Sequence, residues 1–134
     1  MSKTARFALI ALCACAITVS ADERERGRYR DRDRIEADTS RLAAVLHDLQ
    51  YERVRFGGDV WRSASNEALA LANRIYAETG GRPEARDIRL QVREMRAEVM
   101  HQDFGEARVH AARAMPFVHA LSDWARGDRD RDRR

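Results

Sequence analysis

The sequence predicts an all-α protein, an up-down-up-down four-helix bundle, and three observations lead to this prediction. Apolar residues recur three and four positions apart in four successive segments, which is typical of helices that each bury one stripe in a left-handed bundle. Short turn signals rich in glycine separate these segments at nearly even spacing, so neighbouring helices are expected to run antiparallel. The alternation of apolar and polar residues that indicates a strand is nearly absent.

The bundle domain is expected over residues 35–125, and its first helix begins just after Asp33. Asp33 and Glu36 have the spacing of a capping box, in which two side chains satisfy free amides at a helix start. The helix is expected to end before the turn at Gly57. Its predicted buried stripe consists of Ile35, Leu42, Val45, Leu46, Leu49 and Phe56.

Glycine and proline mark the boundary between the second and third helices. Gly80 is placed to end the second helix in a left-handed conformation, and Pro83 suits the first turn of the third, where its missing amide costs nothing. Asp59 is expected to cap the start of the second helix. The stripe of the second helix consists of Trp61, Ala64, Ala68, Leu71 and Ile75, and that of the third consists of Ala85, Ile88, Val92, Met95 and Val99.

The fourth helix is expected to start at another capping box, formed by Asp103 and Glu106. It contains one irregularity. Pro116 lacks a backbone amide and clashes with the carbonyl group four residues earlier, so the sequence predicts a kink or a split near this position. The predicted stripe consists of Ala107, His110, Ala114, Phe117, Leu121 and Trp124.

The first 21 residues have the three regions of a cleaved export signal. Lys3 and Arg6 form a basic head, residues 7–19 are almost entirely apolar, and small residues lead up to Ala21. A helical run of this length covers about 20 Å, which is short of the roughly 30 Å hydrocarbon core of a membrane. We therefore expect a signal peptide cleaved after Ala21, a periplasmic or secreted protein, and no transmembrane span after processing.

A lipoprotein anchor is an alternative for the same segment. The stretch Leu12-Cys13-Ala14-Cys15 resembles a processing site at which Cys15 is lipidated and becomes the first mature residue. The apolar run that continues after Cys15 would be an unusual start for a mature chain, which favours cleavage after Ala21.

Cleavage of the signal would remove several reactive residue types from the mature chain. The signal carries both cysteines and the only lysine, Lys3, so disulfides, thiol nucleophiles, thiolate metal sites and Schiff-base lysines are excluded after cleavage. Without Lys3 and Arg6, the 25 basic residues fall to 23, all arginine, against 22 acidic residues. The remaining length suffices for one domain.

Charged low-complexity segments flank the predicted bundle at residues 22–34 and 126–134. They lack the apolar area that would offset the entropy of ordering, so we expect disorder in both. The C-terminal segment offers candidate contacts for a polyanion such as an envelope glycolipid: Arg129, Arg131, Arg133 and Arg134. The interleaved aspartates oppose such contacts and favour a solubilising role, and no nucleic-acid partner is expected.

Among the histidines, only His110 falls on a predicted buried stripe, which makes it a weak candidate metal ligand. A half-buried histidine bonded to a neighbour is the simpler interpretation. Glu98 and His101 have the E-x-x-H spacing of di-iron bundles, but the sequence has no second such pair. No complete catalytic set and no cofactor motif is present, so an enzyme is not expected.

The sequence therefore predicts a small exported, non-catalytic helical protein with a structural, protein-binding or envelope-stress role. Its partner would be another protein or an envelope surface. A metal- or cofactor-binding bundle and a polyanion-binding protein with arginine-rich tails are the alternatives. The oligomeric state stays open, and a homodimer is compatible with the alanine-rich stripes.

Overall fold

The computed structural model describes residues 26–27, 31–51 and 58–132, and for residues 128–132 it describes the backbone alone. The chain divides into two units, Met1–Asp33 and Arg34–Arg134. In the first unit, the described residues 26–27 and 31–33 are helical. The predicted cleavage site after Ala21 and the alternative lipidation site at Cys15 lie outside the described residues.

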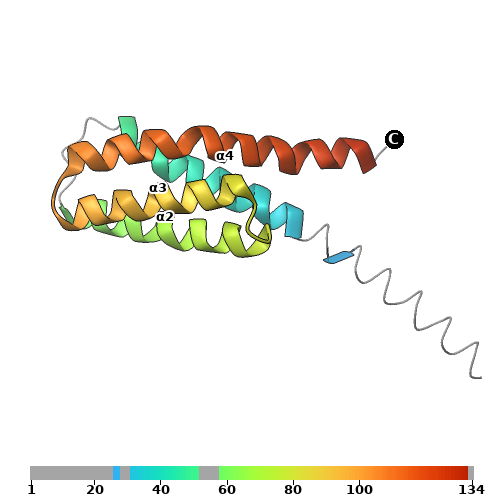
Figure 1. Ribbon diagram of the computed structural model, residues 1–134, viewed down its shortest axis with the longest axis horizontal. Coiled ribbons are helices and arrows are strands. Elements are labelled where there is room, and N and C mark those ends of the chain that lie inside the picture. Colours follow the sequence, from blue (N-terminus) through green and yellow to red (C-terminus); the bar gives the residue numbers. More distant parts are fainter. Residues whose placement is uncertain (1–25, 28–30, 52–57, 133–134) are drawn as a thin grey trace, which may run out of the picture. The chain divides into compact units, whose positions relative to one another are not determined.

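Over the described residues the structure is all-helical, with four helices and no strand. These are the N-terminal helix (residues 31–51), α2 (Gly58–Glu78), α3 (Pro83–Met100) and α4 (Phe104–Asp132). Within the second unit the helices lie alongside one another, and α3 packs against both α2 and α4 (Figure 1). None of the described helices is long and apolar enough to cross a membrane.

Two helices extend beyond their expected limits. The N-terminal helix is already formed at residue 31, so Asp33 lies inside it and does not cap its start. Helix α4 continues past Ala125 to Asp132, through most of the C-terminal segment for which disorder was expected. Asp128 and Arg131 are three positions apart in this segment, a spacing at which opposite charges support a helix.

The buried stripes predicted for the first three helices are largely confirmed. Trp61 is only 2% exposed, Ala64 is half-buried, and Phe56 lies outside the described residues. The other predicted residues of these helices are buried: Ile35, Leu42, Val45, Leu46, Leu49, Ala68, Leu71, Ile75, Ala85, Ile88, Val92, Met95 and Val99. They form one continuous hydrophobic core.

The stripe predicted for α4 is only half correct. Its buried residues are Ala107, Ala111, Ala114, Val118, Leu121 and Ala125. The predicted members His110, Phe117 and Trp124 are half-buried at the edge of this stripe. Small residues on the buried face allow α4 to approach the other helices closely, while the larger rings cover the sides of the contact.

Helix α4 crosses Pro116 without a break, so it is not split there. At its start, the carboxylate of Asp103 accepts a hydrogen bond of 3.0 Å from the amide of Glu106, which is one half of the predicted capping box. The amide of Asp103 is occupied elsewhere, because it donates to the carbonyl oxygen of Glu98 at 2.9 Å. The reciprocal half of the box is therefore replaced by a contact with the end of α3.

The end of α2 forms a Schellman motif in which Gly80 takes the left-handed position that the sequence predicts for it. Gly80 has a positive φ of 65°, and its amide donates to Ala77. The amide of Gly81 donates to the carbonyl oxygen of Tyr76 at 3.0 Å, which completes the motif. Pro83 then occupies the first turn of α3.

The end of α3 forms the same motif without glycine. Gln102 takes the left-handed position, with a φ of 63°, and its amide donates to Val99. The amide of Asp103 completes the motif through its bond to Glu98. Because both helix ends have this motif, their last carbonyl groups are satisfied within short turns.

Candidate functional site

The predicted ligand His110 lies on the side of α4 that faces α3. Its Nδ1 is 2.9 Å from Oε1 of Gln91. Because an amide oxygen only accepts, Nδ1 carries the proton in this contact and Nε2 keeps a free lone pair when the ring is neutral. The half-buried, bonded histidine that the sequence suggests is therefore present, and a role for His110 as a metal ligand stays a prediction.

The other candidate ligands do not gather around His110. Over the described residues, no group of three or more histidine, cysteine or acidic side chains is close enough to hold a metal ion. His101 is exposed and lies at the C-terminal cap of α3, and Glu98 is half-buried one turn earlier. In this protein the E-x-x-H pair therefore lies at the C-terminal end of α3.

The arginines proposed as polyanion contacts are only partly described. Arg129 and Arg131 lie within α4, although their side chains are not described, and Arg133 and Arg134 lie outside the described residues. Polyanion binding by these four arginines stays a prediction.

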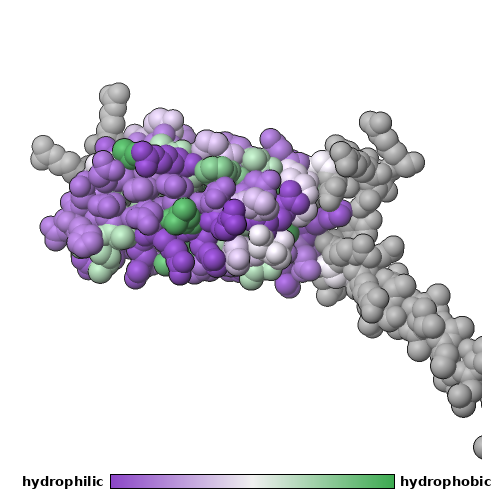
Figure 2. Space-filling view, in the orientation of Figure 1, coloured by the Kyte–Doolittle hydropathy of each residue, from purple (hydrophilic) through white to green (hydrophobic). Residues whose placement is uncertain are grey.

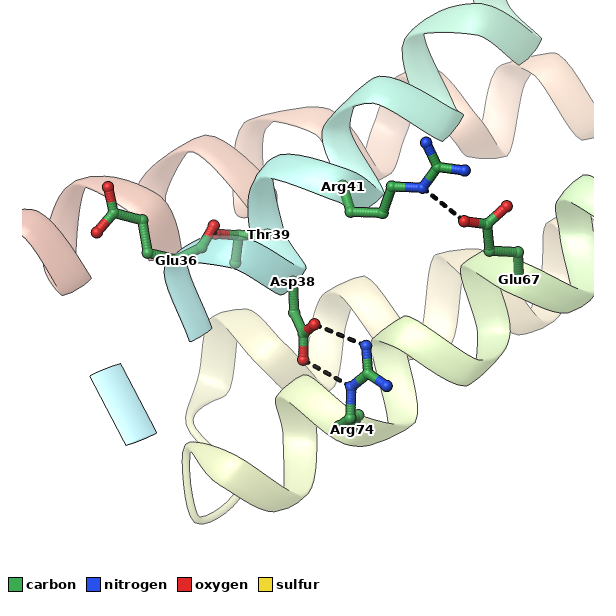
Figure 3. A network of polar contacts seen from close by, with 6 residues as sticks. All are labelled: Glu36, Asp38, Thr39, Arg41, Glu67 and Arg74. Atoms are coloured by element: carbon green, nitrogen blue, oxygen red, sulfur yellow. Dashed lines mark hydrogen bonds and ion pairs between the residues drawn. The ribbon is translucent and has the colours of Figure 1, made fainter. Parts of the chain in front are cut away.

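A part-buried ion pair that the sequence did not predict joins the N-terminal helix to α2. The carboxylate of Asp38 accepts two hydrogen bonds of 2.7 Å from the guanidinium of Arg74 (Figure 3). Asp38 is only 9% exposed, whereas more than half of the Arg74 side chain is in solvent. Two parallel bonds from one planar guanidinium fix the relative position of the two helices.

A second carboxyl group, that of Glu78, lies beside this ion pair at the end of α2. Burial raises the pKa of Glu78, and the negative charge of Asp38 raises it further, while the positive charges of Arg74 and Arg34 oppose the rise. Its Oε2 is buried without a hydrogen-bond partner among the described residues. Glu78 therefore lies in the field of both the Asp38 carboxylate and the Arg74 guanidinium, and burial together with Asp38 outweighs the arginines in setting the direction of its pKa.

Nearer the middle of the same two helices, an exposed ion pair borders a pocket. Nε of Arg41 donates to Oε1 of Glu67 at 2.6 Å (Figure 3). Glu67 raises the pKa of Arg41 through this bond, and the charge of Asp48 raises it further, so Asp48 also lies within the field of the guanidinium. The rim of the pocket therefore contains two carboxylates and one cation.

This pocket has a volume of about 250 Å³ and an apolar floor. Val45 and Leu49 of the N-terminal helix contribute to the floor together with Val60 and Ala64 of α2, and the rim residues are Arg41, Asp48 and Glu67. Binding sites for drug-sized molecules start at about 300 Å³. The pocket therefore fits a single side chain better than a cofactor.

Exposed apolar side chains are scattered over much of the remaining surface. The face shown in Figure 2 is mostly hydrophilic, with separate apolar residues on it. Large exposed apolar residues are Tyr51, Val60, Leu90, Met100 and Val109. Of these, Val60 also lines the pocket, so its exposed surface adjoins the apolar floor.

The sequence contains few signals for this pocket. Val45, Leu49 and Ala64 appear in it as ordinary members of buried stripes, while Arg41, Asp48 and Glu67 appear as solvated helix charges. Only the side-by-side placement of the two helices joins them into one site. Comparisons with protein-family models, with curated proteins and with solved structures find no match for this chain.

Proposed function

We propose that this protein is a small exported, non-catalytic helical protein that binds another protein. The pocket between the N-terminal helix and α2 is the observation that carries this proposal. It combines an apolar floor with a charged rim, which is the arrangement found at the centre and edge of protein interfaces. Its size suits an anchoring side chain of a partner.

The polar contacts between the N-terminal helix and α2 support a binding role rather than a catalytic one. Arg41 is hydrogen-bonded to Glu67, and Asp38 is bonded twice to Arg74. These groups are engaged with one another across the helix interface, so they position the helices. A reproducible hydrolytic or redox activity of the purified protein that one point substitution abolishes would contradict the proposal.

Site-specific photo-crosslinking in the native host tests the binding role. A photoreactive residue at position 60, which lines the pocket and is partly exposed, should give a discrete adduct with a partner protein. Leu90 on α3 is the matched control, because it is 53% exposed and Val60 is 47% exposed, but it does not line the pocket. Identical adducts from both positions, or none from position 60, would contradict the proposal.

For the fold we propose that the four helices follow an up-down-up-down order, with a kink in α4 at Pro116. The turns after α2 and α3 are short, which supports antiparallel neighbours. Nε of Arg126 lies 3.6 Å from Oε1 of Glu36, which supports a position of α4 beside the N-terminal helix. With Cys13 and Cys15 replaced by alanine, cysteines at 36 and 126 should react with a short bifunctional reagent, and cysteines at 36 and 108 should not.

For the localisation we propose export with cleavage after Ala21, into the periplasm or the medium. The basic, apolar and small-residue regions of the first 21 residues support it. Protein purified from the native host should have the intact mass of a chain that begins at Asp22. The mass of a chain that begins at a lipidated Cys15 would support the lipoprotein alternative instead.

A further inference from the structure

The pocket between the N-terminal helix and α2 has an excess of negative charge above an apolar floor. Arg41 supplies one positive charge at the rim, and Asp48 and Glu67 supply two negative charges. More than half of the Asp48 side chain is exposed, and its Oδ1 lies 3.9 Å from Nδ1 of His47. Arg41 donates its described hydrogen bond to Glu67 and not to Asp48. An incoming cation can therefore pair with the Asp48 carboxylate.

The apolar floor limits the kind of cation that fits. Val45, Leu49, Val60 and Ala64 offer methyl groups, so a cation with an aliphatic stem gains apolar contact as well as charge pairing. A small inorganic cation would lose its hydration shell against this floor without replacement ligands. The volume of about 250 Å³ is suited to one long side chain.

We propose that this pocket binds one arginine side chain from an extended segment of a partner protein. The stem lies on the apolar floor, and the guanidinium pairs with Asp48 at the rim. Arginine is favoured over lysine because a planar guanidinium is less strongly hydrated and pairs with a carboxylate through two parallel bonds. This inference rests on the proposed protein-binding function and names the chemistry of the partner.

Nuclear magnetic resonance of the full chain with a minimal peptide tests the inference. The probe is acetyl-Gly-Gly-Arg-Gly-Gly-amide, in which arginine is the only side chain, and the matched peptide carries neutral citrulline instead. The arginine peptide should shift the methyl signals of Val45, Leu49 and Val60, with a Kd on the order of 1 mM for so small a ligand. The citrulline peptide should leave these signals in place.

Two variants separate the charge from the shape of the pocket. Asp48→Asn removes the negative charge of this side chain and should weaken binding about three-fold, in line with a solvent-exposed ion pair. Ala64→Leu fills the floor and should abolish the shifts, provided that circular dichroism shows unchanged helix content. Asp123→Asn on α4 is the control for a lost exposed charge, and it should bind like the unmodified chain.

Each result decides the inference separately from the proposed function. Equal shifts with the citrulline peptide, or unchanged affinity in Asp48→Asn, would overturn arginine recognition. Absence of methyl shifts with the arginine peptide at 10 times the expected Kd, about 10 mM, would overturn it as well. Crosslinking from position 60 would persist in these cases if the protein binds a partner of other chemistry.

Discussion

The turn after α2 and the turn after α3 have the same hydrogen-bond pattern but different residues at the left-handed position. Gly80 has a φ of 65° and Gln102 has a φ of 63°, and the flanking amides bond to equivalent carbonyl groups. Glycine adopts this conformation without steric cost, whereas a residue with a Cβ pays about 1 kcal/mol. The comparison shows that the left-handed helix end forms because it satisfies the last carbonyl groups of the helix. Glycine at this position lowers the strain energy but is not required.

The two turns also differ in their last helical residue. Glu78 ends α2 with an acidic group, and Met100 ends α3 with an apolar one. A negative charge at a helix C-terminus opposes the helix dipole, and burial adds to its cost. At the first turn, Gly80 is favourable for the backbone but the charge of Glu78 is unfavourable. At the second turn, Gln102 is strained but Met100 carries no charge.

Gly81→Ala should have the largest effect on the first turn, a loss of about 2 kcal/mol in the free energy of unfolding. Gly81 has a φ of 77°, and an added Cβ would lie 3.2 Å from the hydroxyl oxygen of Tyr76. The guanidinium of Arg89 lies 3.6 Å from the centre of the Tyr76 ring, so a shift of Tyr76 would disturb this contact as well. Urea unfolding followed by circular dichroism measures the change.

Gly105→Ala is the control for this substitution. Gly105 lies in the first turn of α4, and an added Cβ would meet only Asp103 at 3.6 Å, an ordinary contact. Alanine is the better helix former, so this variant should be unchanged or more stable by up to about 1 kcal/mol. A loss at Gly105 equal to that at Gly81 would show that glycine content, and not the local geometry, controls the effect.

Gly80→Ala should have the second largest effect, a loss of about 1 kcal/mol. Its φ of 65° strains any residue with a Cβ, but no atom lies within 4 Å of the added carbon. The difference between the two glycine variants therefore measures the contact with Tyr76. The same urea titration should place Gly80→Ala between Gly81→Ala and the unmodified chain, and a reversed order would contradict this explanation.

Gln102→Gly should make the second turn resemble the first and stabilise the protein by about 0.5 kcal/mol. The gain is the relief of strain at a φ of 63°, reduced by the greater freedom of glycine in the unfolded chain. Gln102→Ala is the control, since it keeps a Cβ and should bring no gain. A stability loss in the glycine variant would mean that the Gln102 side chain contributes to the turn.

The smallest effect should come from Glu78→Gln, and it depends on pH. The raised pKa of Glu78 means that the folded protein holds a proton which the unfolded chain releases above the ordinary value of 4.5. Stability from this group is therefore present at acid pH and is lost as pH rises through the raised pKa. Glu78→Gln should be more stable than the unmodified chain at pH 7, with the difference shrinking as pH falls through the raised pKa and absent below pH about 4.5.

Glu84→Gln should show the opposite pH dependence in the same urea titrations. Its own backbone amide lowers the pKa of Glu84, and Arg82, whose Nε lies 3.4 Å from Oε2, lowers it further, while burial opposes the fall. The carboxylate thus adds stability above its ordinary pKa and loses it as pH falls through the lowered value. Equal pH profiles for both variants would contradict these assignments.

Local signals in the sequence were sufficient for most of the helical fold. Gly80 and Pro83 located the turn between α2 and α3, and the spacing of apolar residues identified nearly every buried hydrophobic residue of the first three helices. The turn after α3 was expected within one or two residues of its position. Its left-handed residue was missed, because Gln102 has no intrinsic preference for that conformation and Gly105 stood nearby.

The pocket and the ion pair between Asp38 and Arg74 could not be predicted in the same way. Asp38 and Arg74 are 36 residues apart, and each resembles a solvated helix charge when the sequence is read alone. Arg41 and Glu67 are 26 residues apart and are equally inconspicuous. Which charged residues of two helices meet depends on the rotation of each helix about its axis, and that is a property of the packed structure.

The sequence by itself determined that this protein is helical and where most of its helices lie, because helix formation depends on spacings of three and four residues along one chain. Tertiary structure decided which side of α4 is buried. Ala111, Val118 and Ala125 are fully buried, whereas His110, Phe117 and Trp124 lie half-buried at the edge of the same face, because the alanines leave room for the close approach of neighbouring helices and the rings do not. It also decided that Asp48 and Glu67 border one apolar pocket, since that requires two helices side by side.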